Sequence, residues 1–401
     1  MSLDQEPGTT AQTCGHEFVW TDQHPRIKDI RKMLHTHDLL ASDALDRIDV
    51  LSPPGNEATN GCPMAKRDMY ALLEQYSVSD ETIGKLWNQV TEIPHWVDWE
   101  QICRGQKLVY QYHGQMQLGH FVEVVESLDS VKPHGKGFAS SVRVRLLHAK
   151  VRRRIMRLWK QRPAYYDMEQ WGVPINDLHQ VATIVAYSAN LVFISLPRMG
   201  IFLTEQQISD YLALWRWVGH IMGTPVDWMA TPVTAKAMME AVLISEMEPS
   251  ANSQIIANNI ITAHAGFPPW YASRHFLAAL AYRLNGDELA LALNIDAPSA
   301  WHRGIVTMQL SVANFLSSSY VLIPKKWQER RDRNFIQYSH NMVTNRKIGG
   351  MGCSTIFEFQ YIPQIGMMTE KGKISMSFWQ RTMASVLGAL MLLSGMISLY
   401  I

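Results

Sequence analysis

Three side chains in one stretch of this sequence could carry out chemistry together. Arg145 and His148 are three residues apart, so on a helix they lie on one face and can point at the same object. A guanidinium stabilises negative charge, and an imidazole can transfer a proton or bind a metal ion. His179 follows 34 residues after Arg145. Taken singly, most histidines are structural, and no partner spacing distinguishes four others: His264, His275, His302 and His340.

Two helices must position these residues. Over residues 141–159, apolar side chains recur every three or four positions and predict a buried stripe bordered by Arg145 and His148: Val144, Leu147, Val151, Ile155 and Leu158. A second helix over 175–196 follows a Gly-Val-Pro turn, with Asn176 or Asp177 as its N-cap. That cap places His179 in the first helical turn. The rest of this helix is apolar on most sides, which predicts burial.

Cations are frequent along the first helix, and seven of them lie away from the predicted stripe: Arg143, Lys150, Arg153, Arg154, Arg157, Lys160 and Arg162. We interpret them as a solvated face rather than a surface for RNA or lipid. The formal net charge of the chain is only +1, which argues against a protein that binds nucleic acid.

Helical periodicity continues through most of the chain, strand-like alternation is weak, and no internal repeat is visible. We therefore predict an all-α protein with a single large helical domain over residues 62–335. A polar arm over 1–61 is expected to be loosely packed, because Pro, Gly, Asp and Asn are scattered through it. Residues 336–382 are expected to form a linker and loop region.

The end of the sequence differs from the rest, since residues 383–401 contain no charge. A helix of this length matches a bilayer core of about 30 Å. Lys371, Lys373 and Arg381 precede it and would keep the folded body on the cytoplasmic side. We predict a membrane tail, with a buried core helix as the alternative. The expected location is intracellular, at the endoplasmic reticulum membrane through this tail, or else cytoplasmic.

The usual catalytic and metal motifs are missing from the sequence. It has no Gly-x-Ser-x-Gly elbow, no His-Glu-x-x-His and no Gly-x-Gly-x-x-Gly after a strand. The four cysteines are far apart and form no Cys-x-x-Cys pair, so neither a zinc site nor a disulfide framework is predicted.

The stretch around Arg145 and His179 resembles the latex-clearing protein (rubber oxygenase) family and the fungal endoplasmic-reticulum-bound oxygenases of meroterpenoid pathways. In latex-clearing proteins an Arg-x-x-Lys-Thr motif precedes the axial histidine by the same 34 residues. Here His148 stands in place of the Lys and Ala149 in place of the Thr. The likeness covers about residues 65–310, with shorter matches at 172–177, 211–219 and 283–288.

This resemblance implies a globin-like core around haem b, with His179 as the axial ligand of the iron. Arg145 and His148 would stand on the opposite side, where the guanidinium stabilises charge that develops on O₂ and His148 exchanges a proton. We also expect Thr183, one turn after His179, to contact the cofactor.

The function that the resemblance implies is that of a haem-dependent oxygenase. Its partners would be O₂ and a small apolar isoprenoid or polyketide-type natural product, whose C=C bond is oxidised or cleaved. The 13 Trp and 22 Met residues suit an apolar tunnel, although they also fill ordinary helical cores. Two alternatives stay open: a haem-dependent isomerase, cyclase or dehydratase, and a non-catalytic, membrane-anchored haem-binding scaffold.

Overall fold

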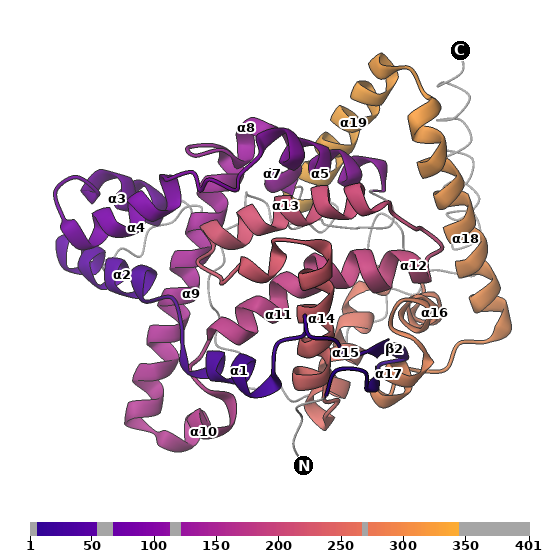
Figure 1. Cartoon of the computed structure of the whole chain (residues 1–401), viewed down its shortest axis with the longest axis horizontal. Helices are drawn as coiled ribbons and strands as arrows, with labels where there is room; N and C mark the ends of the chain where they lie inside the picture. The colour runs from indigo at the N-terminus through magenta and orange to yellow at the C-terminus, as the bar shows by residue number, and fades with distance from the viewer. Residues whose placement is uncertain (1–5, 54–66, 113–121, 267–271, 345–401) are drawn as a thin grey trace. The chain divides into compact units, whose positions relative to one another are not determined.

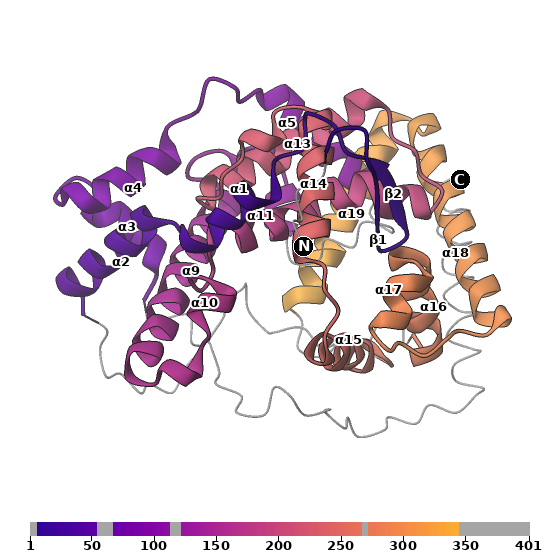
Figure 2. The same cartoon turned by 60° about the horizontal axis from the view of Figure 1, so that its bottom comes forward.

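The computed structural model describes residues 6–53, 67–112, 122–266 and 272–344, and it is mostly helical in these ranges (Figures 1 and 2). The predicted all-α class is confirmed. A single small hairpin is present in the described part of the chain, where β1 (Thr10–Thr13) pairs antiparallel with β2 (His16–Val19). The predicted membrane tail over 383–401 lies outside the described residues, as does most of the predicted linker over 336–382.

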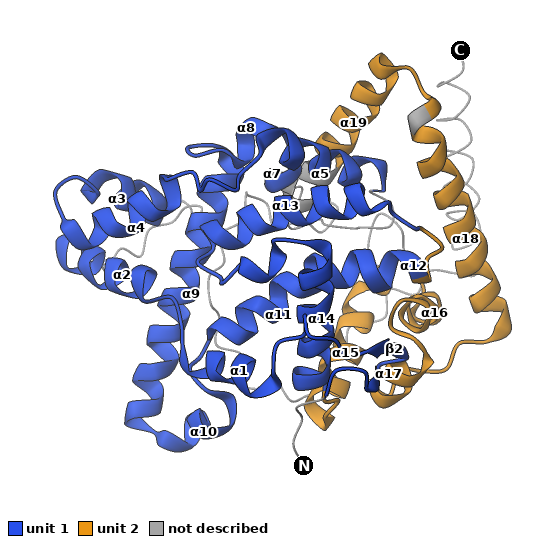
Figure 3. Ribbon diagram, in the orientation of Figure 1, with its two compact units in different colours: residues 1–197, 202–247, 355–359 blue, residues 198–201, 248–354, 360–401 orange. Residues whose placement is uncertain are grey.

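The chain groups into two compact units (Figure 3). The first comprises residues 1–197, 202–247 and 355–359, and the second comprises 198–201, 248–354 and 360–401, of which residues 345–401 lie outside the described ranges. We predicted one domain over 62–335, whereas the structure divides the chain near residue 247. Residues 6–53 also belong to the first unit instead of standing apart from it.

The first unit contains the hairpin and most of the helices. Their bounds are α1 Ile27–Arg31, η1 Lys32–His35, α2 Leu39–Leu51, α3 Met69–Tyr76, α4 Glu81–Thr91, α5 Trp99–Gln111, α7 Val122–Val125, α8 Leu128–Val131, α9 Lys136–Gln161, η4 Pro163–Tyr165, α10 Met168–Trp171, α11 Asp177–Tyr187, η5 Leu191–Ser195, α12 Leu196–Arg198, α13 Glu205–Ile221, η6 Asp227–Met229 and α14 Pro232–Glu246. The division between the units falls within α12.

The second unit contains the remaining described helices: α15 Ala251–His264, α16 Arg274–Asn285, α17 Asp287–Ala292, α18 Ala300–Ser319, η7 Tyr320–Leu322 and α19 Lys325–Thr344. Its buried cluster includes Ile261, Tyr282 and Ile295. Helix α16 ends at Asn285, and the following Gly286 has a φ of 86° that favours glycine.

The N-terminal region is better packed than its polar sequence indicated. In α2, four side chains spaced three or four residues apart are fully buried: Ala41, Ala44, Leu45 and Ile48. They belong to a core that α4 completes with Ile83, Leu86 and Val90. The expectation of a loosely packed arm is therefore wrong for residues 6–53, since their apolar side chains lie on one face and have a partner helix.

Helix α9 turns a different face to the core than the sequence predicted. The expected apolar stripe, exemplified by Val144 and Val151, is only half-buried. The fully buried line runs instead through Phe138, Val142, Arg145, Ala149 and Arg152. Two arginines thus occupy core positions, which is tolerated only where each guanidinium finds acceptors.

Helix α11 begins after its predicted cap: the Asn176 side chain accepts a hydrogen bond from the His179 backbone N–H at 2.9 Å. The helix continues through a π-helical turn, η5, into α12, so Asp177–Arg198 is one continuous helix. In the described residues this is the one helix long and apolar enough to cross a membrane. In the most apolar 18-residue segment of this helix, half of the residues are buried within the structure, as expected of a core helix.

Candidate functional site

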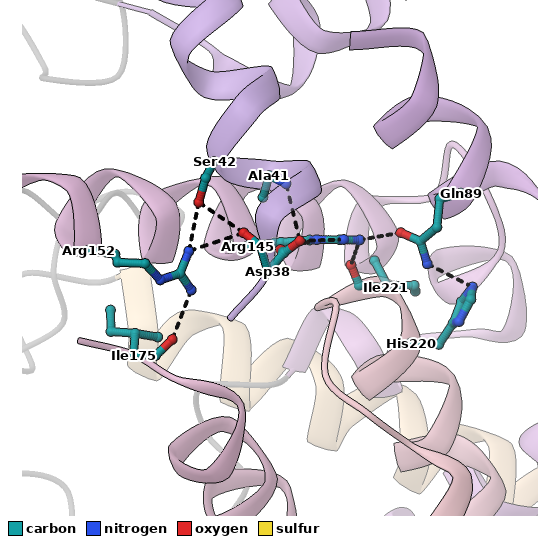
Figure 4. Close-up of polar contacts among 9 residues, drawn as sticks. All are labelled: Asp38, Ala41, Ser42, Gln89, Arg145, Arg152, Ile175, His220 and Ile221. Carbon is teal, nitrogen blue, oxygen red and sulfur yellow. Dashed lines mark hydrogen bonds and ion pairs between the residues drawn. The ribbon is translucent and has the colours of Figure 1, made fainter. Parts of the chain in front are cut away.

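Arg145 is the centre of a buried polar network on α9 (Figure 4). Its Nε and Nη2 atoms donate to the two carboxylate oxygens of Asp38 at 2.6 and 3.0 Å. Its Nη1 atom donates to Gln89 Oε1 at 2.5 Å and to the carbonyl oxygen of Ile221 at 3.1 Å. Gln89 is in turn 3.4 Å from His220 Nε2. The guanidinium therefore joins α9 to α2, α4 and the end of α13.

Arg152 lies two turns further along the same buried line and binds mainly backbone. Its Nε donates to the Pro174 carbonyl at 3.1 Å, and its Nη2 donates to the Ile175 carbonyl at 2.9 Å. Its Nη1 reaches Ser42 Oγ at 3.0 Å and the Asp38 carbonyl at 3.3 Å. Burial lowers the pKa of Arg152, and the nearby Asp38 opposes that shift. Arg152 thus connects α9 to the turn that precedes α11.

His148 lies between these two arginines in sequence and is half-buried. Its Nδ1 atom is buried, and Gln180 on α11 is its side-chain hydrogen-bonding neighbour, although in the described part of the chain neither Nδ1 nor Gln180 Nε2 makes a hydrogen bond of good geometry. The pKa of His148 is lowered, first by burial and then by the Arg152 charge, while Gln180 and Asp38 oppose the shift. A neutral imidazole with a free ring nitrogen remains able to accept or donate a proton.

His179 occupies the first turn of α11, as predicted, and its imidazole is half-buried. Its Nδ1 atom lies 3.2 Å from Asn176 Nδ2. Asn176 Oδ1 accepts from the His179 backbone N–H, so the atom that faces the ring is the amide nitrogen, which can only donate. The neutral ring therefore carries its hydrogen on Nε2 in this orientation. Burial lowers the pKa of His179, and Glu246 partly opposes that shift.

The face of α11 that carries His179 is open. Thr183 and Ala186, four and seven residues after His179, are both exposed, although the helix is otherwise largely buried. The Thr183 hydroxyl donates to the His179 carbonyl at 2.8 Å, so it is satisfied within the helix.

Arg145 and His179 are held by different sets of partners. The partners of Arg145 belong to α2, α4 and α13, whereas those of His179 and Thr183 belong to α11 and its cap. Arg145 and His179 share no hydrogen-bond partner among the described residues. A pocket elsewhere on α13 is lined by residues that include Trp96, Ser209, Arg216 and Thr231, and none of the four predicted residues lines it.

A second polar cluster was not predicted from the sequence. The buried Glu240 carboxylate of α14 lies 3.0 Å from His16 Nε2 and 2.9 Å from His24 Nε2. Two imidazoles and a carboxylate are a common metal-binding set, but the backbone N–H of Thr21 donates to His24 Nδ1 at 3.0 Å. His24 Nε2 therefore carries the hydrogen and donates to Glu240. The cluster fastens the N-terminal segment to α14 by hydrogen bonds.

A model of the family described as "ER-bound oxygenase mpaB/B'/Rubber oxygenase, catalytic domain" matches residues 118–313. The matched range includes α9 and α11 and hence all four predicted residues. The predicted resemblance to this family is confirmed. A rubber oxygenase of Streptomyces sp. (strain K30) is 24% identical over 170 residues, which are 41% of this chain and 39% of that protein. The chain thus matches about two-fifths of the length of this curated relative.

A solved structure entitled "Structure of Latex Clearing Protein LCP in the closed state" is similar to this fold, with a TM-score of 0.53 and 17% sequence identity. The similarity covers 76% of this chain and 91% of that chain. This similarity confirms the predicted all-α fold.

Whether this chain can hold haem b depends on its own residues. In the described ranges no group of three or more His, Cys, Asp or Glu side chains is arranged to hold a metal ion, but a haem iron needs only one imidazole from the protein. His179 is the candidate for that imidazole, on a helix line whose next residues are exposed. For Nε2 to bind iron, the ring hydrogen must move to Nδ1. The contact between Nδ1 and Asn176 Nδ2 must then be lost, because both nitrogens would be donors.

Arg145 fits its predicted role less well. We expected a guanidinium free to stabilise charge on O₂, but four hydrogen bonds to Asp38, Gln89 and Ile221 occupy most of its N–H groups. The Asp38 carboxylate also neutralises its charge. Sequence reasoning missed Asp38 because it lies 107 residues before Arg145. Its one local signal was its position as the cap of α2.

Proposed function

We propose that this protein is a haem-dependent oxygenase that uses O₂ to oxidise or cleave a C=C bond in an apolar isoprenoid or polyketide-type natural product. The observation that supports this most strongly is the family match over residues 118–313, because that range contains both α9 and α11. The names of the family and of the Streptomyces relative describe oxygenases.

In this proposal His179 holds the iron of haem b through its imidazole. The bound haem supplies the O₂-binding and redox chemistry, which no protein side chain provides. Asn176 caps the first turn of α11 and so positions the His179 backbone, and the exposed line of Thr183 and Ala186 receives the porphyrin edge. Because its pKa is lowered, His179 is neutral near pH 7, the form that a metal requires.

His148 is the proton-handling group in the proposal. Its lowered pKa favours the neutral imidazole, and its Nδ1 atom has only the neutral Gln180 side chain beside it, so it can give or take a proton near the reacting carbons. Arg145 acts by position: it fixes α9 against α2 and α13 and so sets where His148 lies. The family Lys and Thr are replaced here by His148 and Ala149, which makes a substrate other than polyisoprene the better expectation.

We further propose that the protein works inside the cell at the endoplasmic reticulum membrane, with a cytoplasmic location as the alternative. The family description includes ER-bound enzymes, and the charge-free residues 383–401 would serve as the anchor. A membrane would concentrate apolar substrates close to the enzyme.

The test begins with the absorbance spectrum of the purified full-length protein, with haem added during expression. We expect a Soret band that His179→Ala abolishes and that His264→Ala, at an exposed histidine, leaves intact. The haem-bound protein should then consume O₂ when a prenylated olefin is added, and mass spectrometry should find oxygen added to the product. His148→Gln should retain the Soret band and lose most turnover.

The outcomes separate the alternatives. Turnover of a natural product without O₂ consumption would indicate a haem-dependent isomerase, cyclase or dehydratase. A Soret band without turnover of any tested olefin would favour a haem-binding scaffold. Absence of haem binding after reconstitution would overturn the proposal.

A further inference from the structure

The turn between α10 and α11 adopts an unusual backbone conformation directly before His179. Gly172 has a φ of 68°, and an added Cβ there would lie 2.2 Å from the Leu34 carbonyl oxygen. Ile175 has a φ of 52°. Glycine adopts such angles readily, but a β-branched residue does so only under strain. Strain of this kind persists only where surrounding contacts enforce it, and it is concentrated at functional sites.

Contacts on two sides hold this turn. On one side, the backbone N–H groups of Val173 and Asp177 donate to the carbonyls of Leu34 and Thr36 at 2.8 and 3.0 Å. On the other side, the two arms of the Arg152 guanidinium donate to two successive carbonyls, those of Pro174 and Ile175. Of the described side chains outside the turn, Arg152 alone hydrogen-bonds the carbonyl of the strained residue.

Arg152 is itself held rigidly. Its side chain is buried, and its remaining nitrogen binds Ser42 Oγ and the Asp38 carbonyl at the start of α2 (Figure 4). A planar guanidinium can bind two neighbouring carbonyls at fixed angles, which the single ammonium of a lysine cannot do. Removing a cation from water costs free energy, and hydrogen bonds to neutral carbonyls offset only part of that cost. A positioning role therefore explains the buried Arg152 better than a stabilising one.

We propose that Arg152 is a positioning residue that enforces the strained conformation of Ile175 and thereby sets the position of the first turn of α11, from which His179 projects. Ile175 is four residues before His179, and Asn176, which accepts a hydrogen bond from the His179 backbone N–H, follows it immediately. A relaxed φ at Ile175 would rotate the Asn176 cap and the first turn of α11 together. This inference rests on the proposed function only in taking His179 as the ligand of the haem.

Two substitutions test the proposal together. In Arg152→Gln we expect the amides of residues 173–179 to exchange hydrogen at least about tenfold faster in the protein without haem. We also expect haem to dissociate roughly 10–100-fold faster from this variant, as for other residues that orient a metal ligand. Ile175→Gly in the same variant should restore most of both losses, because glycine adopts the required φ without enforcement. Arg153→Gln is the matched control, since Arg153 pairs with Asp46 and Asp49 nearer the surface.

Each arm of the experiment decides a separate point. If the wild-type protein binds no haem, the proposed function fails, and hydrogen exchange still tests the role of Arg152. Exchange in Arg152→Gln that rises equally in α13, with no recovery from Ile175→Gly, would show a merely structural role and overturn the inference.

If Arg152→Gln does not fold, Arg152→Lys takes its place, with the same expected pattern.

Discussion

The carboxylate of Asp38 binds the guanidinium of Arg145 through both of its oxygens, with neither side chain more than 5% exposed. The same carboxylate caps α2 by accepting the Ala41 N–H at 3.1 Å. The Asp38 side chain thus caps the start of α2 and also balances the charge of the buried Arg145. Because the pair is cut off from water, loss of either partner leaves the other charge without compensation.

Asp38→Asn should therefore lower the free energy of unfolding by about 3–5 kcal/mol, because it leaves Arg145 buried and unpaired while an Asn can still cap α2. Asp68→Asn is a matched control. Asp68 caps α3 and pairs with Arg143 in the same way, but both side chains are more than 40% exposed. We expect the control to lose about 0–1 kcal/mol. Urea unfolding measures both, and equal losses would contradict the argument from burial.

Gly223 lies against the same guanidinium, and its substitution should be costly. An added Cβ would be 2.7 Å from Arg145 Cζ, and φ is +73°. The positive φ alone costs an L-residue about 1–2 kcal/mol. Because four hydrogen bonds hold the guanidinium in place, we expect Gly223→Ala to cost more than that. Gly8→Ala and Gly266→Ala are controls with positive φ and open space. Thermal unfolding should rank Gly223→Ala as the most harmful, and a loss no greater than in the controls would refute this.

Asn176→Asp should reverse the tautomer of His179. A carboxylate at this position accepts a hydrogen bond from Nδ1–H, which leaves Nε2 free for a metal and makes the ring more basic. We expect the pKa of His179 to rise in NMR titration, and the reduction potential of the haem-bound protein to fall. Asn176→Ser keeps the cap without adding a charge, so its histidine should titrate close to wild type. Equal titration in both variants would mean that the Nδ1 contact does not control the ring.

Stability should decrease on mild acidification. Burial lowers the pKa values of His148, His179 and His220 in the folded protein. Below about pH 6.5 the unfolded chain therefore binds protons that the folded chain does not, and stability is lost as the pH falls through this window. His148→Gln should flatten the dependence of Tm on pH between 7 and 5, whereas His264→Gln, at an exposed position, should leave it unchanged. A slope that is the same in His148→Gln would show that this imidazole does not contribute.

Much of the helical framework follows from local signals in the sequence. Helices α13 and α14 have such signals, because a threonine caps the start of each. The predicted cap of α11 at Asn176 is also present. By contrast, α19 runs to Thr344, whereas we expected a linker and loop region from residue 336. Its many charges hid the helical period.

The site was less predictable than the framework because its partners are remote in sequence. The 34-residue spacing identified His179, but nothing near Arg145 indicated that Asp38 and Gln89 would bind it. Likewise, the apolar stripe of α9 seemed to define its buried face, whereas two arginines satisfied by distant acceptors took that place. Periodicity reports only the hydrophobicity of side chains along a helix. It cannot show that a charged side chain is paired with an opposite charge from a distant part of the chain.

The π-helical turn at Leu191–Ser195 has a consequence for how chains of this kind can vary in length. Such a turn amounts to one residue inserted into an α-helix. Removing one residue here would leave a regular α-helix and would advance everything after it by about 100° of rotation, since an α-helix has 3.6 residues per turn. The segment that carries His179 lies before the insertion and would stay in register. Homologues could therefore gain or lose a residue at this point. The chain after it would change direction, while the start of the helix, which carries His179, would stay in place.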